Sequence, residues 1–96
     1  MEREEITRIL ALHRKELEGL GVRSLALFGS VVRGEARPDS DVDILVKFSK
    51  PVGLFEFIRL KHRLEEILGR SVDLVTRAAL KPQLRDRILE ECVNAL

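Results

Sequence analysis

The sequence predicts an α+β fold (a two-layer α/β arrangement) in which helices pack on a small mixed β-sheet. Helical and extended patterns alternate along the chain, in the order helix, strand, strand, helix, strand, helix. The chain has 96 residues, of which 45% are hydrophobic and 34% are charged. This size and composition suit one modest hydrophobic core. We therefore expect a single domain over residues 1–96.

The helices are predicted from apolar residues that repeat at helical spacing. Three segments show this period: residues 2–18, 54–68 and 83–94. Pro82 directly precedes the third segment and suits the first turn of a helix. Residues 30–34 could add one short helical turn. On this pattern Cys92 is a small core residue of the last helix.

The strands are predicted from short apolar runs bounded by turn residues. These runs span residues 23–28, 42–48 and 71–75, and the second is the clearest because it is compact and β-branched. Residues 35–41 are expected to form a loop, and residues 49–53 a connection that contains proline and glycine.

The charge and cysteine content exclude several classes of protein. Seventeen Lys and Arg residues against 16 Asp and Glu residues leave a net charge of +1, so strong binding of long nucleic acid through charge is not expected. No apolar run reaches the length of about 18 residues that a membrane span needs. The single Cys92 excludes an internal disulfide and a cysteine-built zinc site. These features favour a reduced, cytoplasmic location.

Two aspartates at the start of the second strand indicate a metal site. Asp41 and Asp43 are two residues apart, so their side chains leave the same face of an extended chain. Two carboxylates so close repel each other unless a cation lies between them. Mg²⁺ suits this role because it prefers oxygen ligands and completes its shell with water and substrate phosphates. Asp73 could join the site if the third strand lies beside the second.

The end of the first strand indicates a phosphate-binding turn. Gly29 permits close approach to the backbone, and Ser30 adds a hydroxyl donor where a helical turn begins. Together with the aspartates, this turn predicts one nucleotide-phosphate site that serves phosphoryl or nucleotidyl transfer. Arg33 is equally suited to bind phosphate or to form an ion pair with a nearby acid.

The motifs and their spacing resemble a known family. Gly29-Ser30, ten further residues and then Asp41-Val42-Asp43 resemble the signature of the DNA polymerase β nucleotidyltransferase superfamily. The wider run over residues 28–46 is similar to the minimal nucleotidyltransferase (MNT) family. The run Val-Asp-Leu-Val-Thr around Asp73 resembles that family's third-carboxylate strand. The resemblance implies a DNA polymerase β-like nucleotidyltransferase fold.

The resemblance also implies a function. Members of the MNT family are commonly encoded beside a HEPN protein, an all-helical RNase toxin, and act as its antitoxin by transferring AMP from ATP to a tyrosine of the toxin. By this resemblance, Gly29 and Ser30 would bind the triphosphate, and Asp41 and Asp43 would hold two Mg²⁺ ions. Asp73 would bind the catalytic ion and could act as a base. A hetero-oligomer with the toxin is expected.

Two other functions remain open at this level. One is an antitoxin that neutralises its partner by docking alone, although a retired active site has no need of three clustered carboxylates. The other is a nucleotidyltransferase that acts on a small molecule or an RNA end. That activity would require a second substrate domain or a basic groove, and the sequence indicates neither.

Overall fold

The computed structural model describes residues 2–96, and it has four strands and five α-helices in that range. The elements run α1 (Arg3–Leu12), α2 (Arg14–Gly19), β1 (Val22–Phe28), α3 (Ser30–Arg33), β2 (Val42–Phe48), α4 (Leu54–Leu68), β3 (Val72–Thr76), a 3₁₀ turn (Arg77–Ala79), α5 (Pro82–Glu91) and β4 (Val93–Asn94). No helix within residues 2–96 is long and apolar enough to cross a membrane.

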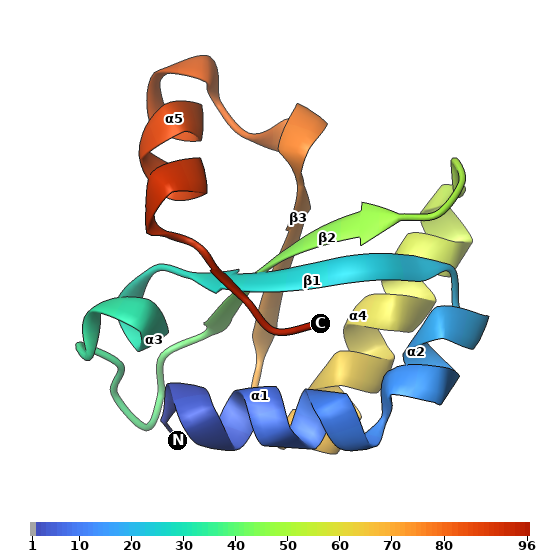
Figure 1. Ribbon diagram of the computed structural model, residues 1–96, viewed down its shortest axis with the longest axis horizontal. Helices are drawn as coiled ribbons and strands as arrows, with labels where there is room; N and C mark the ends of the chain where they lie inside the picture. The colour runs from blue at the N-terminus through green and yellow to red at the C-terminus, as the bar shows by residue number, and fades with distance from the viewer. Residues whose placement is uncertain (1) are drawn as a thin grey trace.

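The strands form one mixed sheet in the order β3-β2-β1-β4. β2 pairs with β1 in the antiparallel sense and with β3 in the parallel sense, and α4 makes the crossover between the two parallel strands (Figure 1). β4 is a short antiparallel partner on the other edge of β1. The predicted small mixed sheet is therefore confirmed.

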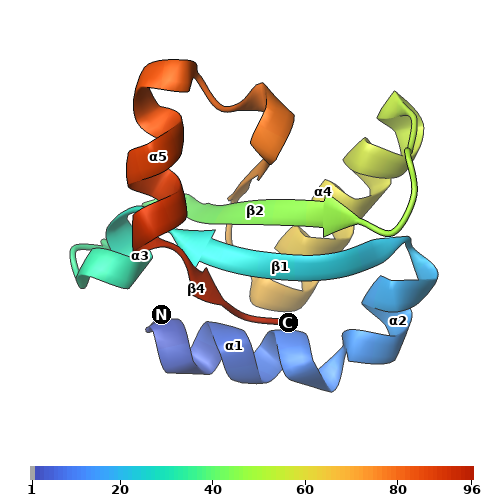
Figure 2. The ribbon, with the colours of Figure 1, turned by 45° about the horizontal axis from the view of Figure 1, so that its top comes forward.

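The hydrophobic core lies on one face of this sheet. Alternate residues of β2 are buried, which places Val42, Ile44 and Val46 toward the helices. The helical contribution comes from residues that are at most 3% exposed: Ile6, Leu10, Leu17, Leu60, Leu64 and Leu68. α5 stands on the side of the sheet away from α1 (Figure 2). The remaining side chains of β2, which include Asp43, thus lie on a face that α1, α2 and α4 leave open.

Most element boundaries agree with the sequence prediction. β2 and α4 span the predicted residues, β1 begins one residue earlier than predicted, and β3 is shifted by one residue at both ends. Gly69 ends α4 in the left-handed conformation, with a φ of 66°, as expected for a residue just beyond a helix. Residues 35–41 lie between α3 and β2 with no regular structure.

The prediction of one helix over residues 2–18 is wrong, because the chain breaks at His13. Its backbone has φ −105° and ψ 16°, and its Nδ1 lies 2.9 Å from the carbonyl oxygen of Ile9. The side chain thus competes with the backbone for a carbonyl near the end of α1. The break lets α1 bury Leu10 and α2 bury Leu17 while the chain turns into β1.

The prediction of a helix over residues 83–94 is also wrong at its C-terminal end. α5 ends at Glu91, and Cys92 is an extended, partly buried residue beyond it rather than a core residue of a helix. The chain then pairs with β1, and the Ala95 N–H donates to the carbonyl of Leu25 over 2.8 Å. These last residues pair with the otherwise free edge of β1 because the backbone groups of that edge need hydrogen-bond partners.

Candidate nucleotide and metal site

Two of the three predicted carboxylates lie on neighbouring strands of the open sheet face, and the third, Asp41, directly precedes β2. Asp43 of β2 and Asp73 of β3 are direct partners in the parallel register. Side chains at paired positions of parallel strands leave the sheet on the same side, and the charge of Asp41, just before β2, is close enough to raise the pKa of Asp43. The structure thus places the Asp73 strand beside the Asp41 and Asp43 strand, as the sequence predicts.

Burial and two neighbouring acids both act on the Asp43 carboxyl. Burial, together with the negative charges of Asp73 and Asp41, raises its pKa to about 6. The positive charge of Arg33 opposes this rise only in part. A cation beside Asp43 would relieve the repulsion and favour the ionised carboxylate.

Gly29 brings the backbone of the turn after β1 against this carboxylate. Its φ of 75° and ψ of −149° lie in a region that only glycine adopts readily. A Cβ at this position would collide with the Asp43 carboxylate. Ser30 follows as the first residue of α3. The predicted phosphate-binding turn and the predicted metal carboxylates are therefore in direct contact.

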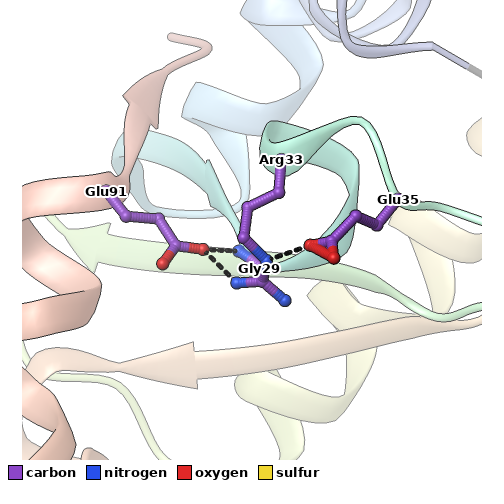
Figure 3. Close-up of polar contacts among 4 residues, drawn as sticks. All are labelled: Gly29, Arg33, Glu35 and Glu91. Atoms are coloured by element: carbon purple, nitrogen blue, oxygen red, sulfur yellow. Dashed lines mark hydrogen bonds and ion pairs between the residues drawn. The ribbon is translucent and has the colours of Figure 1, made fainter.

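Arg33 pairs with two glutamates in this structure. Its Nε donates to Glu35 over 2.5 Å, and its Nη1 donates to Glu91 over 2.7 Å (Figure 3). The hydrogen bond with Glu35 contributes most to raising the pKa of the guanidinium. Of the two roles that the sequence allows for Arg33, the ion pair is the one seen here, and a role in phosphate binding remains a prediction.

Sequence analysis missed two residues that contact this region. Glu91, at the end of α5, accepts a hydrogen bond from the Gly29 N–H over 2.7 Å. Arg70, in the turn before β3, donates through Nη2 to the carbonyls of Arg37 and Ser40 and so holds the loop that leads to Asp41. Sixty-two positions separate Glu91 from Gly29, so no local sequence pattern could reveal that contact.

The carboxylates suit a hard cation that keeps other ligands. Asp43 is crowded by like charges, and oxygen donors are those that Mg²⁺ prefers. Within residues 2–96, however, no three acidic, histidine or cysteine side chains gather closely enough to hold a metal ion. A bound ion would therefore take part of its shell from water or from the phosphates of a substrate, as Mg²⁺ commonly does.

A hollow of about 440 Å³ lies between the sheet and α5, further along β2 than Asp43, and none of the predicted site residues lines it. Ala26 and Leu45, which pair across β1 and β2, form part of its floor, and Leu89 of α5 forms part of its wall. Leu45 follows Asp43 by two residues on the same face. The hollow is thus near the carboxylates along β2 and has partly apolar walls.

Comparison with known proteins identifies the family. Residues 8–94 match the family described as nucleotidyltransferase domain. A protein adenylyltransferase MntA of Thermococcus cleftensis is 52% identical over 91 residues, which cover 94% of this chain and 92% of the relative. A provisionally named protein adenylyltransferase of Methanocaldococcus jannaschii is 46% identical over 79% of this chain and 82% of its own length.

Solved structures agree with this similarity. One, of a provisionally named minimal nucleotidyltransferase, has a TM-score of 0.74 and 39% identity, and the match covers 97% of this chain and 95% of that one. A toxin–antitoxin structure with AMP-PNP shares the fold, with a TM-score of 0.73 and 23% identity over 95% of this chain and 72% of that chain. From its fold and these relatives, the chain belongs to the nucleotidyltransferase family and, within it, to the minimal nucleotidyltransferases of the MntA type.

Proposed function

We propose that this protein is a Mg²⁺-dependent protein adenylyltransferase that transfers AMP from ATP to a tyrosine of a HEPN-type RNase toxin and thereby acts as its antitoxin. The observation that carries the proposal is the contact between the Gly29 turn and the Asp43 carboxylate, with Asp73 in register beside it. The name of the 52% identical relative supports the activity. Solved toxin–antitoxin complexes with the same fold support the kind of partner.

In this proposal the chain binds the triphosphate between the turn and the carboxylates. The backbone of Gly29 and the hydroxyl of Ser30 bind phosphate oxygens, and Arg33 adds a positive charge close to Asp43. Asp41, Asp43 and Asp73 would hold Mg²⁺ together with water and the substrate phosphates, and the ion would neutralise charge on the phosphates and polarise the α-phosphate. The hollow lined by Leu45 and Leu89 has room for the nucleoside.

The transfer step is an in-line displacement at the α-phosphorus. The tyrosine oxygen forms a bond to this phosphorus, the bond to the oxygen that bridges to the β-phosphate breaks, and pyrophosphate leaves. The hydroxyl proton passes to Asp73, which thus acts as a general base, and then to water. Asp41 and Asp73 are exposed, so a tyrosine carried by another macromolecule can reach them.

Intact-mass spectrometry tests the transfer. The purified protein is incubated with ATP, Mg²⁺ and the helical toxin encoded beside it, and the toxin is expected to gain mass in increments of one AMP on a tyrosine. The variant with Asp41→Asn and Asp43→Asn should give no increment. Asp39→Asn, in the exposed loop before β2, removes one acid outside the sheet and should leave the increments unchanged.

The alternatives give different results in the same experiment. A toxin that stays unmodified while its RNase activity is blocked would identify an antitoxin that acts by docking alone. Radiolabelled AMP that appears on RNA or on a small molecule, with the toxin unlabelled, would identify another acceptor. Either result would contradict the proposed transfer to tyrosine.

A further inference from the structure

The Glu91 carboxylate occupies the donors of the proposed phosphate-binding turn. A single oxygen, Oε1, accepts from the Gly29 N–H and from Arg33 Nη1, both over 2.7 Å (Figure 3). The Glu91 side chain is only 18% exposed, whereas that of Arg33 is 45% exposed. A backbone N–H and a guanidinium that converge on one anionic oxygen are the donors that proteins offer to phosphate.

Glu91 also adds a negative charge to a site that already holds the carboxylates of Asp41, Asp43 and Asp73. The turn that Glu91 contacts lies against Asp43. Burial and two further carboxylates already raise the pKa of Asp43. Phosphate oxygens that approach Gly29 and Arg33 would meet this glutamate directly, because one oxygen cannot share its place with another. The two anions therefore compete for the same donors.

The segment that carries Glu91 is less buried than the helices of the core. No residue of α5 is buried, and Leu84 in its middle is 42% exposed. α5 begins without a side-chain cap, and it stands apart from the layer of α1 and α4 (Figure 2). The last turn is partly buried through Ile88 and Leu89 but has no fully buried residue, so its displacement would disrupt fewer apolar contacts than displacement of α1 or α4.

We propose that Glu91 is a built-in competitor of the nucleotide, which closes the phosphate-binding turn in the free protein and is displaced, with the end of α5, when a triphosphate binds. The inference rests on the proposed nucleotide-binding role of Gly29 and Arg33. Since only the fraction of molecules with Glu91 displaced accepts the nucleotide, the apparent dissociation constant equals the intrinsic one divided by that fraction. Only Cys92 separates α5 from β4, so displacement of the end of α5 would also shift the β4 residues at the edge of the sheet.

Nucleotide titration of Glu91→Gln tests the proposal. Glutamine keeps the shape and can still accept from Gly29, but it loses the charge that strengthens both contacts. We expect isothermal titration with ATP and Mg²⁺ to show about tenfold tighter binding than for the wild type, which corresponds to about 1.4 kcal/mol. Glu90→Gln is the matched control. It removes one charge from the neighbouring, exposed residue and should leave the affinity unchanged.

Two further probes separate competition at the turn from a general effect. Inorganic tripolyphosphate should bind Glu91→Gln more tightly than the wild type by a similar factor, whereas adenosine should bind both proteins equally. Glu91→Asp, which keeps the charge but shortens the side chain, should also tighten tripolyphosphate binding because its carboxylate no longer reaches both donors.

The outcomes are distinguishable from those of the transfer experiment. If the wild type binds ATP and Glu91→Gln binds it equally or more weakly, the competitor role is wrong while the proposed function stands. An equal gain in Glu90→Gln would reduce the effect to net charge and would likewise overturn the role of Glu91. If neither the wild type nor the variants bind ATP with Mg²⁺, the proposed function fails and the inference falls with it.

Discussion

At the scale of single residues, Asp43 is where the requirements of folding and of the proposed chemistry conflict. Its carboxylate is half-buried, lies against the backbone of Gly29 and is paired in register with another acid. In the unfolded chain this carboxyl is in water and has a pKa of about 3.9. The folded state raises the pKa to about 6, so the ionised form destabilises the fold.

We expect Asp43→Asn to stabilise the metal-free protein in a pH-dependent manner. Below about pH 4 both forms are neutral at this position and should have similar stability. As the pH rises through about 6, the wild type loses its proton and with it stability, because the folded state binds the proton more tightly than the unfolded state. Above that pH the variant should be more stable by about 1 kcal/mol, or about 4–8 °C in Tm, a value reduced for the partial exposure of the carboxylate.

Thermal unfolding from pH 4 to pH 8 in the presence of a chelator measures this effect. Asp39→Asn serves as the control, because Asp39 lies in the exposed loop before β2. A stability difference for Asp43→Asn that stays constant from pH 4 to pH 8 would contradict the assignment of the penalty to ionisation of Asp43.

At the scale of elements, the junction between β1 and α3 is determined by β2. The backbone at Gly29 must turn with a positive φ, and the Asp43 carboxylate fills the space where a side chain would begin. Gly34, at the other end of α3, has a similar φ of 72° but no atom within 4 Å of the place of a Cβ. Both glycines therefore need a positive φ, but only Gly29 also lacks room for a side chain.

Gly29→Ala should destabilise the protein by about 3 kcal/mol or more, because the new methyl group adds a collision with Asp43 to the cost of the conformation. Gly34→Ala should cost only about 1–2 kcal/mol, the cost of the left-handed conformation alone. Chemical denaturation of both variants measures the difference. Equal losses would mean that Asp43 moves aside without cost, and the close contact would then not constrain the turn.

At the scale of the whole molecule, the residues that stabilise the fold and the residues of the proposed chemistry lie on opposite faces of the sheet. The apolar residues of β2 face the helices, and no charged residue within residues 2–96 is buried there. Asp43 and Asp73 lie on the opposite face, where Asp43 contacts the Gly29 turn. Substitutions of the acids can therefore change ligand binding without removing core contacts.

This separation predicts a magnesium-dependent stabilisation by ATP. ATP with Mg²⁺ should raise the Tm far more than ATP alone, because the cation relieves the repulsion between the phosphates and the aspartates. At a hundredfold excess over Kd, the stabilisation should be about 2.7 kcal/mol. Differential scanning fluorimetry with ATP, with and without Mg²⁺, measures the effect, and Asp41→Asn with Asp43→Asn should abolish it. The same Tm with and without Mg²⁺ at saturating ATP would count against a metal site at these aspartates.

The sequence by itself determined the features that depend on neighbouring residues. Apolar periodicity predicted the bounds of β2 and α4, because each face of these elements repeats within a few residues. The side chains of Asp41 and Asp43 share a face because of their spacing alone, and Gly29 is predicted as a turn because of its position between a strand and a short helix.

Only the tertiary structure decided which distant residues meet. The alignment of Asp73 with Asp43 required the parallel pairing of β2 and β3, which α4 connects. The hydrogen bond from the Gly29 N–H to Glu91 required α5 to return over the open face of the sheet. β4 formed because the edge of β1 offered backbone partners, which outweighed the helical pattern of residues 92–94. These contacts join residues far apart in the chain, and their free energy exists only when the sheet has assembled. Local patterns could therefore predict the donors and acids of the site, but not the glutamate that closes it.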